Sequence, residues 1–215
     1  MKRLIIFDLD GTLLNTIADL ANSTNYALGQ LGINAHPLES YNTFVGNGIR
    51  KLFERALPVT LRSPEMVEKV RSLFIPYYDV HNADLTTVYP GIPELLTTLQ
   101  EKGVKIAVAS NKYQKASVKL MEHFFPEIQF CSVLGQREGI PVKPDPSIVL
   151  ELLKTAGATA EETLYVGDSG VDMQTARNAQ VESVGVTWGF RSLEELQVNG
   201  ARHIIHKPEE LIALI

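Results

Sequence analysis

The stretch FDLDGTLLNT, residues 7–16, directly follows an apolar run at residues 4–6 that is typical of a buried strand. Asp8 and Asp10 stand where this strand ends and a loop begins, and Gly11 permits backbone conformations that are closed to other residues. Both carboxylates can therefore converge on one site. Two like charges in one place are unfavourable without a cation or a shared proton, so the stretch indicates a metal site, an acid/base site or both.

The composition is that of an ordinary water-soluble chain and argues against nucleic-acid binding. The 215 residues are 45% hydrophobic and 21% charged, with a formal net charge of −5. This length suits one large domain, or a core with a smaller companion. Because no basic excess is available to neutralise phosphates, we expect no nucleic-acid partner.

The chain carries no sign of export. The apolar run before Asp8 is too short for a signal peptide, and no apolar stretch reaches the length of a membrane span. A single cysteine, Cys131, excludes an intrachain disulfide, and its apolar neighbours predict a buried thiol in a strand. We expect a cytoplasmic protein in a reducing compartment, a monomer or a homodimer, with no membrane partner.

Apolar periodicity divides the chain into two regions. Residues 16–82 show helical spacing at 17–31, 49–57 and 64–78, and no convincing strand. From residue 83, strands and helices alternate: strands are predicted at 104–109, 130–134, 163–166, 183–186 and 203–205, and helices at 92–102, 114–124, 147–156, 171–179 and 208–214.

This alternation predicts an α/β fold. We expect a Rossmann-like core, built from residues 1–15 and 83–215, in which a parallel sheet has helices on both faces. An all-helical insertion, residues 16–82, interrupts that core directly after its first strand. In such sheets, ligands bind beyond the carboxyl ends of the strands, so polar residues at those ends are the best functional candidates.

Three segments carry such residues at strand ends: Asp8-Leu9-Asp10-Gly11-Thr12, Ser110-Asn111-Lys112 and Gly167-Asp168-Ser169-Gly170-Val171-Asp172. A fourth, Val142-Lys143-Pro144-Asp145-Pro146, holds a lysine in a loop between them. Each alone has a simpler interpretation. Strand-end acids and a Ser-Asn pair commonly cap helices, and a lone lysine is usually solvated. Their joint occurrence at one end of one predicted sheet favours a shared site.

In order and separation, these segments resemble the four motifs of the haloacid dehalogenase-like hydrolase superfamily: DxDGT, a strand-terminal Ser-Asn, Lys-Pro and GDSxxD. Within the superfamily the chain is most similar to phosphoglycolate phosphatases, through FDLDGTLLNT, FVGNGIRKLFERAL, YPGI, SNK, KPDP and VGDSGVDMQTARNAQ. The resemblance spans essentially the whole chain and implies that residues 16–82 form a small helical cap domain.

The resemblance also implies a mechanism. Asp8 would attack phosphorus and form an aspartyl-phosphate, while Asp10 would protonate the leaving alkoxide and then deprotonate water. Ser110 and Lys143 would hold phosphoryl oxygens. The implied substrate is a small phosphorylated metabolite, 2-phosphoglycolate above all.

The implied cofactor is Mg²⁺. Its ligands would be the Asp8 carboxylate, the Asp10 backbone carbonyl and Asp168, and Asp172 would support the site by orienting Lys143 or water.

Further residues are expected around the substrate. Thr12 and Asn111 would bind phosphate, and Thr12 beside Asp10 is typical of phosphatases rather than sugar phosphomutases. Gly46 and Asn47 belong to a loop that we expect to reach over the substrate, and Arg50 could meet a substrate carboxylate.

Two alternatives remain open on the sequence. The same chemistry could act on pyrophosphate, a nucleotide or a sugar phosphate. A receiver-like binding module, switched by a phospho-aspartate, also gathers strand-end acids, Mg²⁺ and a lysine. The second aspartate of the DxD pair favours the hydrolase over this module.

Overall fold

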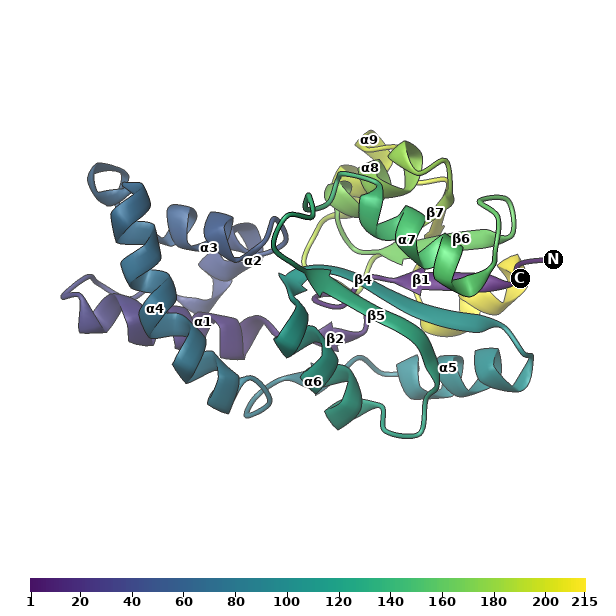
Figure 1. Cartoon of the computed structure of the whole chain (residues 1–215), viewed down its shortest axis with the longest axis horizontal. Coiled ribbons are helices and arrows are strands. Elements are labelled where there is room, and N and C mark those ends of the chain that lie inside the picture. The colour runs from purple at the N-terminus through teal and green to yellow at the C-terminus, as the bar shows by residue number, and fades with distance from the viewer.

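The computed structural model describes residues 1–215, which fold into an α/β core and a separate helical bundle (Figure 1). The core sheet has six parallel strands in the order β5-β4-β1-β6-β7-β8. These strands are β1 (Leu4–Phe7), β4 (Lys105–Tyr113), β5 (Phe130–Gln136), β6 (Thr163–Gly167), β7 (Glu182–Val186) and β8 (His203–Ile205). The α/β prediction with a parallel sheet is confirmed.

Helices cover both faces of this sheet (Figure 1). On one face lie α5 (Ile92–Glu101) and α6 (Gln114–Phe124), with the 3₁₀ helix η3 (Pro208–Leu214). On the other lie α7 (Ser147–Ala156) and α8 (Gly170–Asn178). The short α9 (Leu193–Val198) follows β7.

Strand β1 is a continuous apolar run, and its surroundings in the sheet explain why. All four of its residues are buried. Ile5 and Phe7 belong to the cluster under α5 and α6, whereas Leu4 and Ile6 belong to the cluster under α7 and α8. Because side chains alternate along a strand, a strand with helices on both faces has to be apolar at every position.

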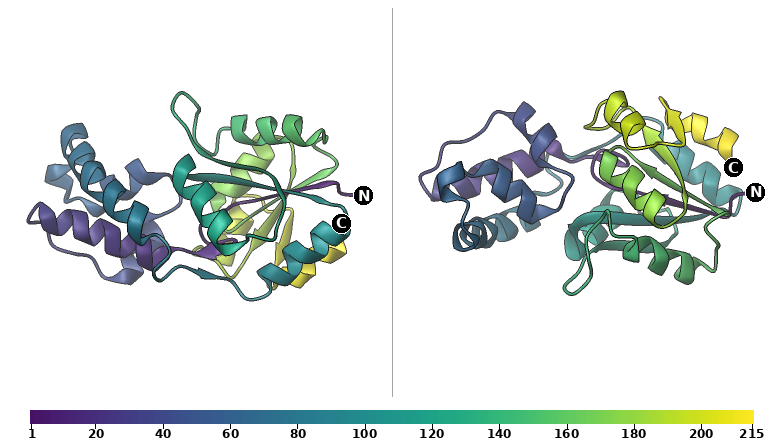
Figure 2. Two further views of the ribbon diagram at one scale, coloured as in Figure 1. Left: turned by 60° about the horizontal axis from the view of Figure 1, so that its bottom comes forward. Right: turned by 90° about the horizontal axis from the view of Figure 1, so that it is seen from above.

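The helical bundle contains α1 (Ile17–Gln30), α2 (Tyr41–Phe44), α3 (Ile49–Ala56) and α4 (Pro64–His81), with the 3₁₀ helices η1 (Leu38–Ser40) and η2 (Val59–Leu61). These helices bury their own apolar cluster, which includes the aromatic rings of Phe53, Phe74 and Tyr78. Both chain termini lie at the far end of the core from this bundle (Figures 1 and 2).

Two antiparallel segments join the bundle to the core. The strand β2 (Leu14–Asn15) leaves the core and pairs with β3 (Thr87–Val88), which returns to it. Next to this ribbon, the buried carboxylate of Asp19 accepts hydrogen bonds from the backbone N–H groups of Leu85 and Thr86 and from the Thr86 hydroxyl.

Some local predictions differ from the structure. Cys131 is exposed, not buried, because β5 is an edge strand of the sheet. Residues 208–214 form a 3₁₀ helix, and β4 continues to Tyr113 instead of ending at Ala109. The short elements η1, α2, η2, α9, β2 and β3 were not predicted, because none of them contains a continuous apolar run like those that mark the equally short strands of the main sheet. No helix combines the length and apolar character that crossing a membrane requires.

Candidate active site

The first site residues follow β1, whose end is shaped by a tight turn. The N–H groups of Thr12, Leu13 and Leu14 all donate to the Leu9 carbonyl, and Gly11 has a φ of +86°. A side chain at Gly11 would collide with the carboxylate of Asp168 on the neighbouring strand. The glycine is therefore needed both for the backbone conformation and for the close approach of the two segments.

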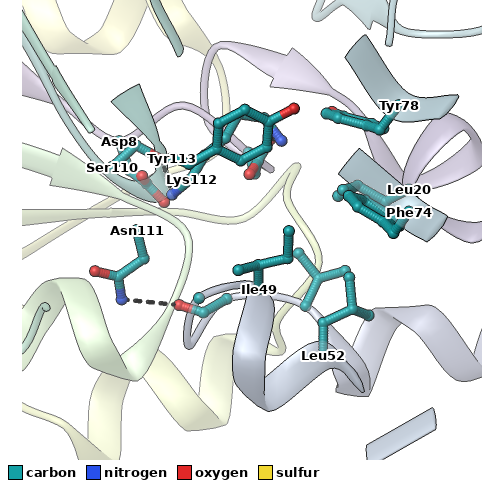
Figure 3. Close-up of a pocket in the computed structure, with 14 residues that line it drawn as sticks. Asp8, Leu20, Ile49, Leu52, Phe74, Tyr78, Ser110, Asn111, Lys112 and Tyr113 are labelled. Atoms are coloured by element: carbon teal, nitrogen blue, oxygen red, sulfur yellow. Dashed lines mark hydrogen bonds and ion pairs between the residues drawn. The ribbon is translucent and has the colours of Figure 1, made fainter. Parts of the chain in front are cut away.

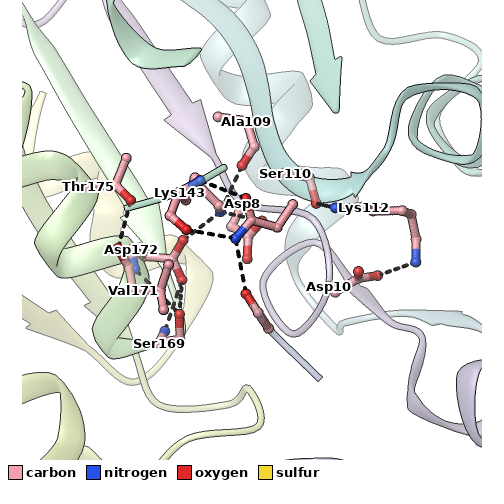
Figure 4. A network of polar contacts seen from close by, with 12 residues as sticks. Asp8, Asp10, Ala109, Ser110, Lys112, Lys143, Ser169, Val171, Asp172 and Thr175 are labelled. Carbon is pink, nitrogen blue, oxygen red and sulfur yellow. Dashed lines mark hydrogen bonds and ion pairs between the residues drawn. The ribbon is translucent and has the colours of Figure 1, made fainter. Parts of the chain in front are cut away.

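Lys143 lies at the centre of the charged groups (Figure 4). Its Nζ atom is 2.9 Å from Oδ1 of Asp8 and 2.8 Å from Oδ1 of Asp172. It also donates to the Ala109 carbonyl at 2.9 Å and to the Tyr165 hydroxyl at 3.0 Å. Burial alone would lower the pKa of Lys143, but the carboxylates of Asp172 and Asp8 raise it well above its usual value. The ammonium is therefore charged and fully coordinated.

Asp172 is held in place by the start of its own helix. Its Oδ2 atom accepts hydrogen bonds from the Ser169 N–H at 3.0 Å and the Ser169 hydroxyl at 2.6 Å, and Ser169 Oγ in turn accepts from the Asp172 N–H. This reciprocal arrangement is a capping box at the N-terminus of α8. Both oxygens of Asp172 are thus occupied by protein donors.

Asp8 and Asp168 carry the charge that remains uncompensated. Burial, with a contribution from the Asp172 carboxylate, raises the pKa of Asp8 to about 7 despite the nearby Lys143. Burial, with Asp172 and Asp8, also raises the pKa of Asp168 well above its usual value, although the Phe190 N–H donates to its Oδ2 at 2.7 Å. A cation bound beside these two buried carboxylates would stabilise their charged forms and so lower both pKa values.

A divalent cation fits this place. Carboxylate oxygens of Asp8, Asp168 and Asp172 come within 4.8 Å of one another, and all three residues are buried. Oxygen ligands of this kind suit Mg²⁺. Because Asp172 already accepts hydrogen bonds at both oxygens, Asp8 and Asp168 are the acids left to hold the ion. The carboxylate of Asp10 points elsewhere.

Asp10 instead faces Lys112 and Thr16. The Lys112 ammonium is 3.0 Å from Oδ1 of Asp10, and the Thr16 hydroxyl donates to the same oxygen at 2.6 Å. Oδ2 of Asp10 has no hydrogen bond within the protein. One oxygen of this acid is therefore anchored, and the other is available to a substrate.

The polar side chains at the end of β4 point to opposite sides of the strand. Lys112 reaches Asp10, whereas Asn111 turns to the Lys143 loop, where its Oδ1 accepts from the Lys143 N–H and its Nδ2 donates to the Lys143 carbonyl. The buried Ser110 hydroxyl accepts from the Lys112 N–H. Alternation of side chains along a strand accounts for this division.

Four further residues were predicted to surround the substrate, and the structure brings only some of them to the pocket. Thr12 is buried and its hydroxyl has no partner within the protein. Gly46 lies at the pocket, and its carbonyl accepts from the Asn111 amide. Asn47 accepts from Arg55, away from the pocket. The Arg50 side chain is 68% exposed and pairs with Glu54, so the structure does not bring it to the acids.

A pocket of about 480 Å³ opens beside Asp8, between the core and the helical bundle (Figure 3). The core supplies a polar wall from Asp8, Asp10, Ser110, Asn111 and Lys112. The helices supply a largely apolar wall, and half of the fourteen lining residues are hydrophobic. The bundle contributes Leu20, Val45, Gly46, Gly48, Ile49, Leu52, Phe74 and Tyr78.

Sequence reasoning missed three residues near this pocket. Lys112 and Thr16 both contact Asp10, and Lys112 could have been found by applying strand alternation to the Ser110 motif. Arg191 donates to the backbone carbonyls of Asn42 and Val45, so it connects the segment after β7 to the bundle. Applying the strand-end rule to β7 would have pointed to it.

The family model for haloacid dehalogenase-like hydrolases matches residues 5–186, most of the chain. The chain belongs to this family. A phosphoglycolate phosphatase from Pseudomonas putida is 34% identical to this haloacid dehalogenase-like hydrolase over 194 residues, which cover 88% of the chain and 71% of the relative. A phosphoglycolate phosphatase from Mesorhizobium japonicum is 34% identical over 191 residues, with 88% and 84% covered.

A solved structure also matches the fold of the chain. The crystal structure of a candidate phosphoglycolate phosphatase from Lactobacillus delbrueckii subsp. bulgaricus superposes with a TM-score of 0.93 at 36% identity, covering 100% of this chain and 99% of the other. The resemblance to this superfamily is therefore confirmed, and this haloacid dehalogenase-like hydrolase is a phosphatase.

Proposed function

We propose that this phosphatase hydrolyses a small phosphomonoester, 2-phosphoglycolate foremost, through an aspartyl-phosphate on Asp8. The observation that carries the proposal is the buried network in which Lys143 contacts both Asp8 and Asp172, directly beside Asp168 and a pocket. The relatives named phosphoglycolate phosphatase support the choice of substrate.

In the first step, an Asp8 oxygen forms a bond to phosphorus and the bond from phosphorus to the ester oxygen breaks. Asp10 gives its proton to the departing oxygen from Oδ2, the oxygen that its anchoring contacts leave free. In the second step, Asp10 takes a proton from water, the water oxygen bonds to phosphorus, and the bond to Asp8 breaks. Inorganic phosphate leaves and both acids return to their starting states.

Other residues would hold the phosphoryl group during these steps. Lys143 offsets the negative charge on Asp8 and on the phosphoryl oxygens. The hydroxyls of Ser110 and Thr12 are proposed to donate to those oxygens; in support, Ser110 lines the pocket and the buried Thr12 hydroxyl has no partner within the protein. Asn111 acts by holding the Lys143 loop.

Asp8 and Asp168, with the Asp10 backbone carbonyl, are proposed to hold Mg²⁺. Bound there, the ion supplies positive charge to the phosphoryl oxygens and to the acids around it. Support comes from the raised pKa values of Asp8 and Asp168, because burial and the neighbouring acids disfavour their charged forms and a bound cation would stabilise them.

We also propose that residues 16–82 act as a cap domain over a core made of residues 1–15 and 83–215. The pocket draws its lining from both parts, so closure of the cap would exclude water and select the leaving group. The apolar wall from the helices offers few hydrogen-bond partners for the hydroxyls of a sugar.

The test measures phosphate release by the purified protein with Mg²⁺ from 2-phosphoglycolate, pyrophosphate, a nucleoside monophosphate and glucose 6-phosphate. We expect 2-phosphoglycolate to have the highest kcat/KM. Asp8→Asn should abolish turnover, and Asp10→Asn should lower kcat by roughly 10²–10⁴-fold.

The same assay separates the alternatives. A higher kcat/KM on another panel member would change the substrate but keep the chemistry. A long-lived phospho-aspartate without phosphate release would favour the receiver-like binding module. Release that is unaffected by Asp8→Asn would overturn the proposed mechanism.

A further inference from the structure

Lys112 is a second buried lysine near the active site, and the proposed chemistry does not use it. It lies near the end of β4, and its side chain is 3% exposed. Its ammonium contacts Asp10 on the core side and lies 4.9 Å from the centre of the Tyr78 ring on α4. The charge is therefore held between the core and the helical bundle, at the pocket (Figure 3).

No other cation lines this pocket. Among its fourteen lining residues, Asp8 and Asp10 carry negative charge and Lys112 carries the single positive charge. Lys143 lies behind Asp8, where its three donors are taken by the Asp172 carboxylate, the Ala109 carbonyl and the Tyr165 hydroxyl. Lys112 is therefore the one cation in the pocket lining that is available to an anion.

Three arginines from nearby segments, two on α3 and one after β7, have other partners. Arg50 is exposed and pairs with Glu54. Arg55 donates to the carbonyls of Thr43 and Phe44 and to the Asn47 side chain. Arg191 donates to two backbone carbonyls of the same loop, as described above. Arg55 and Arg191 therefore hold the loop at residues 42–47, and Arg50 pairs within its own helix.

Lys112 has unused donor capacity. An ammonium carries three N–H donors. Its single polar contact within the protein is to Oδ1 of Asp10. A largely desolvated ammonium with free donors is a strong site for a second anionic oxygen, because few water molecules compete for it.

The position of Lys112 determines which part of a substrate it can reach. Asp10 is the proposed acid for the departing ester oxygen, so its neighbour Lys112 lies on the leaving-group side of the scissile bond. Ser110 and Lys143 lie on the phosphoryl side. A charged group one or two bonds beyond the ester oxygen would come next to the Lys112 ammonium.

We infer that Lys112 binds a second anionic group of the substrate, a carboxylate on the carbon next to the ester oxygen, and thereby sets specificity for small phosphorylated hydroxy acids. This inference rests on the proposed function, because it takes Asp10 as the group that faces the leaving oxygen. The inference goes beyond the proposed function by assigning recognition of the leaving group to a residue of the core.

The test compares two substrates that differ only in charge, 2-phosphoglycolate and the phosphate ester of glycolamide. Lys112→Met should lower kcat/KM for the carboxylate at least tenfold more than for the amide, because the amide lacks the charge that Lys112 pairs with. Lys112→Arg should restore part of the lost preference. Lys51→Met is the matched control, since Lys51 is an exposed lysine of the helical bundle that pairs with Glu54.

Binding to Asp8→Asn protein, measured by calorimetry, separates this inference from the proposed function. Loss of affinity for 2-phosphoglycolate but not for the amide on adding Lys112→Met supports the inference even if wild-type turnover is absent. An equal loss for both ligands would overturn it and leave Lys112 a positioning residue for Asp10. Equal binding of both ligands by the Asp8→Asn protein that keeps Lys112 would also overturn it. Thermal melting of each variant shows whether it has folded.

Discussion

Three buried carboxylates gather at the active site, two of them in contact with Lys143, and their environments differ. Asp172 accepts hydrogen bonds at both oxygens and contacts Lys143. Asp8 shares Lys143, and burial raises its pKa to about 7; burial also raises the pKa of Asp168 well above its usual value. At the residue scale, Asp172 therefore organises the site, while Asp8 and Asp168 are left reactive.

Asp172→Ala should destabilise the protein by about 3 kcal/mol, because it removes one partner of a buried ion pair and leaves the Ser169 N–H without an acceptor. Urea unfolding would measure the change. The matched control is Glu194→Ala, which removes an exposed acid from the first turn of α9 and should change stability by less than about 0.5 kcal/mol. Equal midpoints for the two variants would contradict the role assigned to Asp172.

Glu182 gives a pH-dependent prediction away from the active site. Hydrogen bonds from Lys2 and His203 lower the pKa of its carboxyl to about 2. A group with a lowered folded-state pKa stabilises the fold above its unfolded pKa, here near 4.5, and loses that effect as the pH falls towards 2.

Glu182→Gln should therefore cost roughly 1 kcal/mol at pH 7, a value discounted because the side chain is about one-third exposed. The difference from wild type should shrink between pH 4.5 and 2, as followed by urea unfolding at each pH. Glu127→Gln, which changes an exposed acid without an ion pair, is the control. A difference that is constant with pH would mean that the Glu182 charge is not responsible.

At the scale of elements, Asp19 joins α1 to the segment that returns from the helical bundle. Its carboxylate accepts hydrogen bonds from Leu85 and Thr86, 66 and 67 residues further along the chain. Together with the pairing of β2 and β3, this contact holds the two connections between bundle and core side by side. The two connections are therefore held together by a buried charge as well as by backbone pairing.

Asp19→Ala should lower stability by about 3 kcal/mol, because it leaves the buried Thr86 N–H and hydroxyl without their charged acceptor. Asp84→Ala removes an exposed acid nearby and should have little effect. Chemical unfolding of both variants checks the difference. If Asp19→Ala is as stable as Asp84→Ala, the contact does not hold the connection.

At the scale of the whole molecule, the pocket exists because two separately packed units face each other. The core contributes charge and the bundle contributes apolar surface, and neither encloses the pocket alone. The buried acids lie at this junction, so their ionisation affects the stability of the entire fold.

The pKa of Asp8 is about 7 in the folded protein, against 3.8 for the free group. Because the folded state keeps a proton that the unfolded chain loses, metal-free stability should fall as the pH rises from about 4 to 7. Mg²⁺ should reverse this loss, and its effect should be larger at pH 8 than at pH 6, where protons compete for Asp8.

At a Mg²⁺ concentration of a hundred times Kd, the expected gain is about 2.7 kcal/mol. Thermal melting with and without Mg²⁺ at pH 6 and pH 8 measures it. Asp168→Asn should fold but lose most of the Mg²⁺-dependent increase in Tm. A melting temperature that is insensitive to Mg²⁺ at pH 8 would contradict the proposed metal site.

Predictions from the sequence succeeded where structure depends on nearby residues. Helix α6 and the strand β8 have the predicted bounds, because apolar periodicity and strand propensity are local properties. The sheet-edge rule then placed Asp8, Lys143, Asp168 and Asp172 near one another, as they are found. The prediction that Cys131 is buried was wrong, because the sequence does not show which strand lies at the edge of the sheet.

By itself, the sequence determined the parallel α/β core and the family, since both depend on the spacing of apolar runs and on motifs at strand ends. Only the tertiary structure decided that Lys112 faces Asp10, that Arg50 points to solvent and that Asp19 holds residues 85–86. These contacts depend on the directions in which side chains from distant segments meet, and packing between the core and the helical bundle sets those directions.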